Sequence, residues 1–184
     1  PTLCDELRDL YPSHPLNRFL PTFDSRRSFR LEELPLLTQP APVLGPGVLY
    51  CLQHLAVREI FAAVPERRME REPALAGIKA IRAVMERSKS EPLGRRWRLY
   101  DVNWCLAELE GDSAPARAAF EAHVVLLRRA HHQDKVLGAI DLTRALIQLA
   151  KISGPAVGEP LLQEALSLSP DWMAQAETIR GGWR

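Results

Sequence analysis

The 184-residue sequence predicts an all-α protein, built of antiparallel helical hairpins stacked as a short α-solenoid behind a proline-rich irregular arm. Three observations lead to this prediction. Apolar residues recur at steps of three and four along six segments, as they do on one face of a helix. Short breaks rich in Gly, Pro, Asp and Ser separate these segments, and short connections make neighbouring helices antiparallel. No segment shows the strict apolar–polar alternation that is typical of strands.

The arm spans residues 1–46 and holds eight of the fifteen prolines. Proline lacks an amide donor and has a fixed φ, so this stretch cannot form one long helix, although residues 2–11 are compatible with a short one. Its many Phe and Leu residues make it too apolar for a free tail. We therefore expect the arm to pack on the helical domain that follows, where it either caps the solenoid or lies in its groove.

The repeat domain is expected to span residues 47–184, and a charged linker separates its first two helices. The first helix is expected at 48–64 and is followed by Pro65. The second helix, 74–88, follows Pro73, which a helix tolerates at its start because the missing donor would have no partner there. Both segments carry apolar residues at helical spacing, so each is expected to bury one face.

The remaining helices are bounded by Gly, Pro and Ser in a similar way. Ser113 follows a Gly-Asp pair and can cap the fourth helix with its hydroxyl. Gly154 and Pro155 separate the fifth helix from the sixth, and Gly181 with Gly182 ends a short seventh. These helices are expected at 96–110, 114–130, 135–153, 156–169 and 171–179.

The helices form three pairs, which indicates an internal repeat. The second helix of each pair carries a small residue, Ala76, Ala116 or Gly158, and these residues are 40 and 42 positions apart. Small side chains let two helices approach closely, and a period of this length is typical of helical solenoids. The predicted hairpins span about 48–90, 96–131 and 135–169, and residues 171–184 form a C-terminal cap.

The last hairpin resembles a known repeat family. Gly158, Leu162, Ala165 and Pro170 stand at the spacing seen in the second helix of a tetratricopeptide repeat, and residues 96–172 resemble degenerate repeats of that family. The resemblance implies that the first helix of each hairpin lines a concave surface, where a peptide or helix of another protein binds. We therefore expect a non-catalytic protein-binding module, such as an adaptor, chaperone or regulatory scaffold.

The same resemblance assigns the residues that would contact the partner. They lie on the first helix of each hairpin and mix basic, acidic and apolar side chains, which suits a partner segment with acids and some apolar residues. By the resemblance they are Arg98, Asp101, Cys105, Glu108, Ile140, Thr143, Ile147 and Lys151, and His54 and Arg58 are the corresponding candidates on the first hairpin.

The middle of the sequence is basic although the net charge of the whole chain is only +1, and this supports an alternative function. Residues 58–98 carry eleven Arg and Lys against six Glu. A Trp flanked by Arg can stack a base and hold phosphates, although interleaved glutamates neutralise part of the charge. The alternative is a regulatory or sensor domain of a larger protein that binds nucleic acid or a small ligand. Its nucleic-acid-binding residues would be Arg67, Arg68, Arg95, Arg96 and Trp97.

No catalytic or metal-binding motif is found in the sequence. His131 and His132 are adjacent and point to different sides of a helix, and Cys51 with His54 lacks a third group to orient the base. We therefore expect no enzyme activity, metal or cofactor. The three cysteines are odd in number and widely spaced, which fits free thiols in a reducing compartment. No run of about 18 apolar residues occurs, so a cytoplasmic protein without a membrane span is expected.

Overall fold

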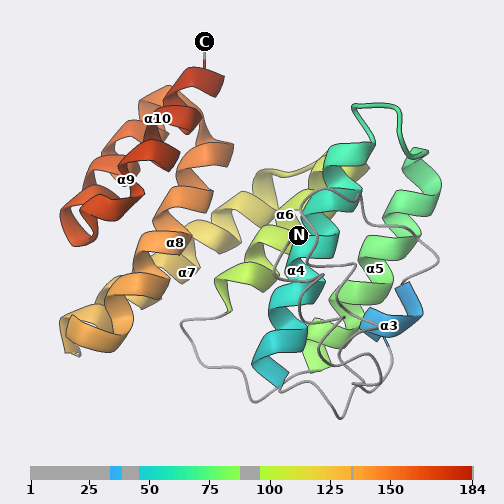
Figure 1. Ribbon diagram of the computed structural model, residues 1–184, viewed down its shortest axis with the longest axis horizontal. Helices are drawn as coiled ribbons and strands as arrows, with labels where there is room; N and C mark the ends of the chain where they lie inside the picture. Colours follow the sequence, from blue (N-terminus) through green and yellow to red (C-terminus); the bar gives the residue numbers. More distant parts are fainter. Residues whose placement is uncertain (1–33, 39–45, 88–95, 134, 184) are drawn as a thin grey trace, which may run out of the picture. The chain divides into compact units, whose positions relative to one another are not determined.

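The computed structural model describes residues 34–38, 46–87, 96–133 and 135–183, and every element within these ranges is helical (Figure 1). The predicted all-α class is therefore confirmed for the described part of the chain. The short helix predicted at 2–11 lies outside it, as does most of the proline-rich arm.

The chain divides into two compact units. The first comprises Pro1–Glu91 with Cys105–Gly111, and the second comprises Pro92–Trp104 with Asp112–Arg184. Helix α6 (Trp97–Glu110) crosses the boundary, so its first half belongs to the second unit and its second half to the first. The boundary lies inside the stretch that the sequence predicted to be one repeat domain.

The first unit is built on the antiparallel pair α4 (Pro46–Ala63) and α5 (Arg71–Arg87). Helix α4 begins at Pro46, two residues before the predicted start, because proline fits the first turn of a helix. Helix α5 begins at Arg71 and therefore includes Pro73 in its first turn. Figure 1 shows the two helices side by side, joined by a short turn.

A short helix, α3 (Leu34–Thr38), packs against both α4 and α5. Leu37 is fully buried, and the Gln53 side-chain amide donates a hydrogen bond to the Leu37 carbonyl oxygen at 2.7 Å. This part of the arm, predicted to be irregular, is therefore helical. Buried apolar surface and a buried hydrogen bond supply the stabilisation that five residues alone lack.

The second unit contains the first half of α6 and all the helices that follow α6 in the chain. Its core joins aromatic residues of α6 and α7 to aliphatic residues of α8, α9 and α10, and includes Trp97, Phe120, Leu146, Leu162 and Ile179. The helices of this unit after α6 are α7 (Ala114–Gln133), α8 (Lys135–Ser153), α9 (Pro155–Leu168), the 3-10 turn η4 (Pro170–Trp172) and α10 (Met173–Gly182).

The buried faces of α5, α7 and α9 share one spacing, but not the predicted register. Each buries residues at i, i+3, i+4 and i+7, starting from Ala74, Phe120 and Gly158. These starting positions are 46 and 38 residues apart, whereas the small residues that suggested the repeat are 40 and 42 apart. Ala76 is exposed, because larger apolar side chains decide which face of α5 is buried.

Helix α9 approaches its neighbours closely at Gly158. A methyl group at this position would lie 2.7 Å from the Ala150 carbonyl oxygen of α8 and would overlap the Trp183 ring. The same Trp183 explains why α10 continues to Gly182, past the predicted end at Ile179. Its indole packs against the core of the unit, and this tertiary contact outweighs the low helix propensity of two glycines.

Two bidentate ion pairs link helices within the second unit. The Arg128 guanidinium of α7 donates to both Glu164 carboxylate oxygens of α9, at 2.8 and 2.5 Å. The Arg180 guanidinium of α10 donates to both Glu159 oxygens of α9, at 2.9 and 2.6 Å. Hydrogen bonding to Arg180 lowers the pKa of Glu159, and hydrogen bonding to Glu164 raises the pKa of Arg128. Both pairs therefore hold α9 in place.

The Arg128–Glu164 pair is expected to couple α7 and α9 measurably. Both side chains are partly buried, and bidentate geometry strengthens a pair that solvent would otherwise screen, so we expect a coupling of about 1 kcal/mol. A double-mutant cycle with Arg128→Ala and Glu164→Ala, read by urea unfolding, measures it. The more exposed pair Arg82–Glu86 within α5 is the control, with about 0.3–0.5 kcal/mol expected. Equal couplings for the two pairs would contradict the prediction.

Candidate functional site

The groove residues predicted on α8 lie partly on the buried face of the helix and partly on its accessible face. Thr143 and Ile147 are fully buried, whereas Ile140 and Lys151 are exposed. The buried face of α8 contacts both α7 and α9, and this packing uses positions that the resemblance placed in the groove. The accessible face of α8 instead carries Ile140, Asp141, Arg144, Gln148 and Lys151.

Most of the groove residues predicted on α6 also lie on a buried face. Arg98, Asp101 and Cys105 are buried, and only Glu108 is exposed. The Arg98 guanidinium lies over the Trp97 ring, 4.8 Å from its centroid. Arg98 is therefore engaged inside the protein, and its charge is not presented to solvent as a groove residue would need.

The groove residues predicted on α4 also lie within the first unit. His54 is buried, and Arg58 is half-buried. The Arg58 guanidinium donates to the Cys105 thiol at 3.6 Å and lies 5.9 Å from the centre of the Phe61 ring. Both residues belong to the packing of this unit, and the predicted groove residues are not gathered on one described surface.

The basic residues predicted to bind nucleic acid are also divided. Arg67 and Arg68 belong to the first unit, whereas Arg96 and Trp97 belong to the second. Arg95 lies outside the described residues. Trp97 is the first residue of α6. It is only 4% exposed and packs in the apolar core of the second unit. It therefore cannot stack a base in this conformation.

Helix α7 carries an exposed apolar face that was not among the predicted binding residues. It lies opposite the buried face of the same helix, which carries Phe120, Val124 and Leu127. Val125 is 42% exposed and Leu126 is 44% exposed. We name this face the α7 stripe: Pro115, Ala118, Ala122, Val125 and Leu126, all exposed.

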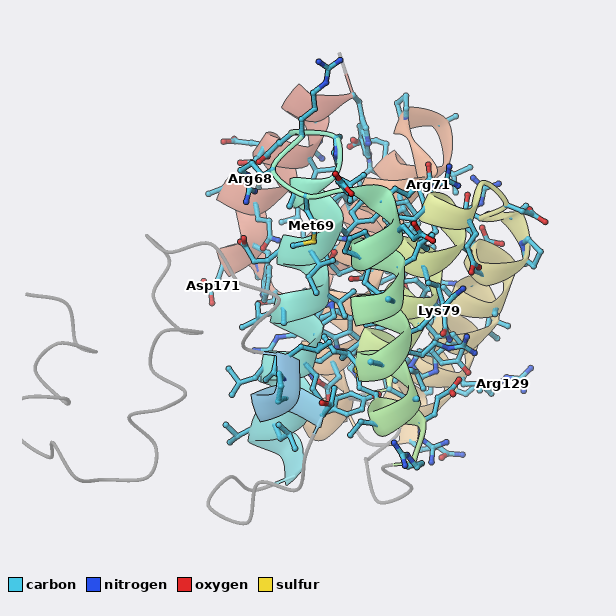
Figure 2. All side chains as sticks on the ribbon, turned by 90° about the vertical axis from the view of Figure 1, so that its right-hand side faces the viewer. Arg68, Met69, Arg71, Lys79, Arg129 and Asp171 are labelled. Carbon is cyan, nitrogen blue, oxygen red and sulfur yellow. The ribbon has the colours of Figure 1, made fainter. Side chains whose placement is uncertain are left out.

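The α7 stripe extends along several turns of the helix. At 1.5 Å per residue, the distance from Pro115 to Arg129 along the axis is about 20 Å. Arg129 is exposed at the C-terminal end of the stripe, and Figure 2 shows its side chain reaching away from the ribbon. The sequence signal was available: apolar residues on both faces of α7 give this helix more apolar positions than one core contact requires.

His123 has a strongly lowered pKa. Its ring stacks on Tyr100 of α6 with centroids 4.4 Å apart, and it is only 1% exposed. Burial, together with the positive charge of Arg96, lowers its pKa to about 4. Its Nε2 atom has no hydrogen-bond partner among the described residues. His123 is therefore neutral at pH 7 and acts as a packing residue of the α6–α7 contact.

The described residues hold no group of three or more His, Cys, Asp or Glu side chains placed to bind one metal ion. No helix in the described ranges is long and apolar enough to cross a bilayer. Comparisons of the chain with family models, curated proteins and solved structures found no match. The resemblance to tetratricopeptide repeats therefore remains a prediction.

Proposed function

We propose that the chain is a non-catalytic protein-binding module, and that its partner docks on the α7 stripe. The observation that carries this proposal is the apolar face of α7, which is exposed along its length while the opposite face fills the core. Contiguous exposed apolar surface is a common mark of protein interaction sites. The short α-solenoid of tetratricopeptide type is the architecture that we propose for this module.

The chemistry of the stripe favours an amphipathic helix of another protein. Ala118 and Ala122 present only methyl groups, and small side chains allow two helix backbones to approach closely. Val125 and Leu126 then supply the larger apolar contacts. Arg129 places a positive charge at one end of the stripe. The partner helix is therefore expected to carry apolar residues at i, i+3, i+4 and i+7, with an acidic residue that meets Arg129.

The rigid setting of α7 also supports the proposal. The Arg128–Glu164 pair and the Tyr100–His123 stack hold α7 against neighbouring helices of its unit. A preorganised helix loses less conformational entropy when it binds than a mobile segment does. The stripe can therefore bind a partner without rearrangement of its own unit.

We expect Val125→Asp or Leu126→Asp to weaken partner binding at least tenfold, because each places a charge in an apolar interface. The measurement is recovery of partner on the immobilised full chain from the native cell extract, followed by titration with the partner identified. Val157→Asp is the matched control, since Val157 is an exposed apolar residue on α9 of the same unit. Circular dichroism confirms that each variant keeps its helicity.

The outcome separates this proposal from its competitors. A protein retained by wild type and by Val157→Asp, and lost with Val125→Asp, supports the stripe. A partner retained equally by all three variants contradicts it. Self-association of the wild type in sedimentation velocity, abolished by Val125→Asp, would instead assign the stripe to a second copy of the chain.

A further inference from the structure

The turn between α4 and α5 has an unusual residue at its tightest point. The Arg68 amide donates to the Ala63 carbonyl at 2.9 Å, and the Arg67 amide donates to the Val64 carbonyl at 3.0 Å. These two bonds define a Schellman motif, which ends a helix with one residue in the left-handed conformation. That residue is usually Gly, because a side chain is disfavoured there. Here it is Arg67, with φ of 57°.

The same turn borders an open concavity with a volume of about 350 Å³. Three arginines line it within five residues of sequence, together with one carboxylate and two apolar side chains. In Figure 2, Arg68, Met69 and Arg71 are labelled around this turn. The lining residues are Val64, Arg67, Arg68, Met69, Glu70 and Arg71.

The charge of this surface is positive after its internal pairs are considered. Arg68 forms an ion pair with Glu66 at 2.5 Å, and Glu70 adds a negative charge to the lining. Neither Arg67 nor Arg71 forms an ion pair with another described residue. Their two guanidiniums can each offer a pair of N–H donors to the oxygens of an anion.

We infer that this turn binds a phosphomonoester that carries an apolar or aromatic group. Arg67 and Arg71 hold the phosphate, which has close to two negative charges at pH 7, and bidentate guanidinium donors match its oxygens. Val64 and Met69 contact the adjoining apolar group, and a methionine sulfur makes favourable contacts with an aromatic ring. The left-handed Arg67 places a cation at this point of the turn, where the more usual Gly would supply none.

The compact footprint favours one phosphate over an extended nucleic acid. All three arginines lie between positions 67 and 71 on a single turn. A single-stranded nucleic acid would need a track of cations with aromatic platforms between them, and the Trp predicted for that role is buried in the other unit. This inference concerns the first unit and is independent of the α7 stripe.

The test is a titration of the full chain with phenyl phosphate, followed by the amide chemical shifts of residues 64–71 in NMR spectra. We expect saturable shifts that weaken as salt is added. Arg67→Gly is expected to weaken binding at least fivefold while the melting temperature stays the same or rises, since Gly fits the left-handed position. Glu70→Gln is expected to strengthen binding several-fold, because it removes the carboxylate from the lining.

The controls decide between this site and its alternatives. Arg87→Gln removes an exposed arginine from the other end of α5 and should leave binding unchanged. Weaker binding of inorganic phosphate, and none of phenol, supports a site that uses both the charge and the apolar group. The inference is overturned if phenyl phosphate gives no saturable shift, or if Arg67→Gly binds it as wild type does. It is also overturned if only a single-stranded oligonucleotide binds.

Discussion

Gly158→Ala is expected to destabilise the second unit by about 1–2 kcal/mol. The new methyl group would lie 2.7 Å from the Ala150 carbonyl oxygen and would overlap the Trp183 ring. The ring can move, but the carbonyl belongs to the backbone of α8, so α9 must shift away from that helix. Overpacking of this kind costs about 1–3 kcal/mol, and the better helix propensity of Ala returns at most about 1 kcal/mol.

Chemical unfolding followed by tryptophan fluorescence measures this effect, because Trp97, Trp172 and Trp183 all contact the core of the second unit. Gly181→Ala is the matched control. It makes the same substitution in a helix, but no atom lies within 4 Å of the new methyl group. This variant should be as stable as wild type or more so. If Gly158→Ala were equally well tolerated, the close approach of α8 and α9 would be wrong.

Protonation of His123 is expected to destabilise the protein as the pH falls. The folded-state pKa is about 4, and the ordinary pKa of a free histidine is 6.5. Between these values the folded protein binds fewer protons than the unfolded chain, so its free energy of unfolding decreases with falling pH. At 1.36 kcal/mol per unit of pKa, the full contribution of His123 is about 3 kcal/mol. It is present above pH 6.5 and lost as the pH approaches 4.

Comparison with His123→Leu isolates this contribution from the titration of carboxylates elsewhere. Between pH 7 and pH 4.5, wild type should lose about 2 kcal/mol more stability than the variant does. An NMR titration of the His123 ring gives a second, direct readout, with an expected pKa near 4. Parallel stability profiles for the two proteins, together with a ring pKa near 6.5, would show that His123 is accessible to water in the folded state.

The boundaries of the helices were largely readable from the sequence, because local residues set them. As predicted, a break at 111–113 separates α6 from α7 and a break at Gly154 separates α8 from α9, which begins at Pro155. Gly111 and Gly154 have φ of 95° and 74°, values that glycine adopts without strain. The glycine pair at 181–182 failed as a stop signal because Trp183 packs back on Gly158, a contact between residues far apart in sequence.

The candidate site was much less predictable. A shift of one residue rotates a helix face by about 100°, so the groove residues on α8 could be misplaced although the helix itself was found. Thr143 and Ile147 are buried because α7 and α9 pack on that face, which periodicity alone does not specify. The left-handed conformation of Arg67, at a position typical of Gly, could not be predicted from the neighbouring residues. Its φ depends on the hydrogen bonds that close the turn.

The sequence by itself determined the helical class, the positions of most helices and the polar breaks between them, since these depend on propensity, capping and spacing within a few residues. Only the tertiary structure decided which face of each helix is buried, where the two units divide and which apolar residues remain exposed on α7. These properties depend on which helices pack against one another, and packing joins residues that the chain holds far apart.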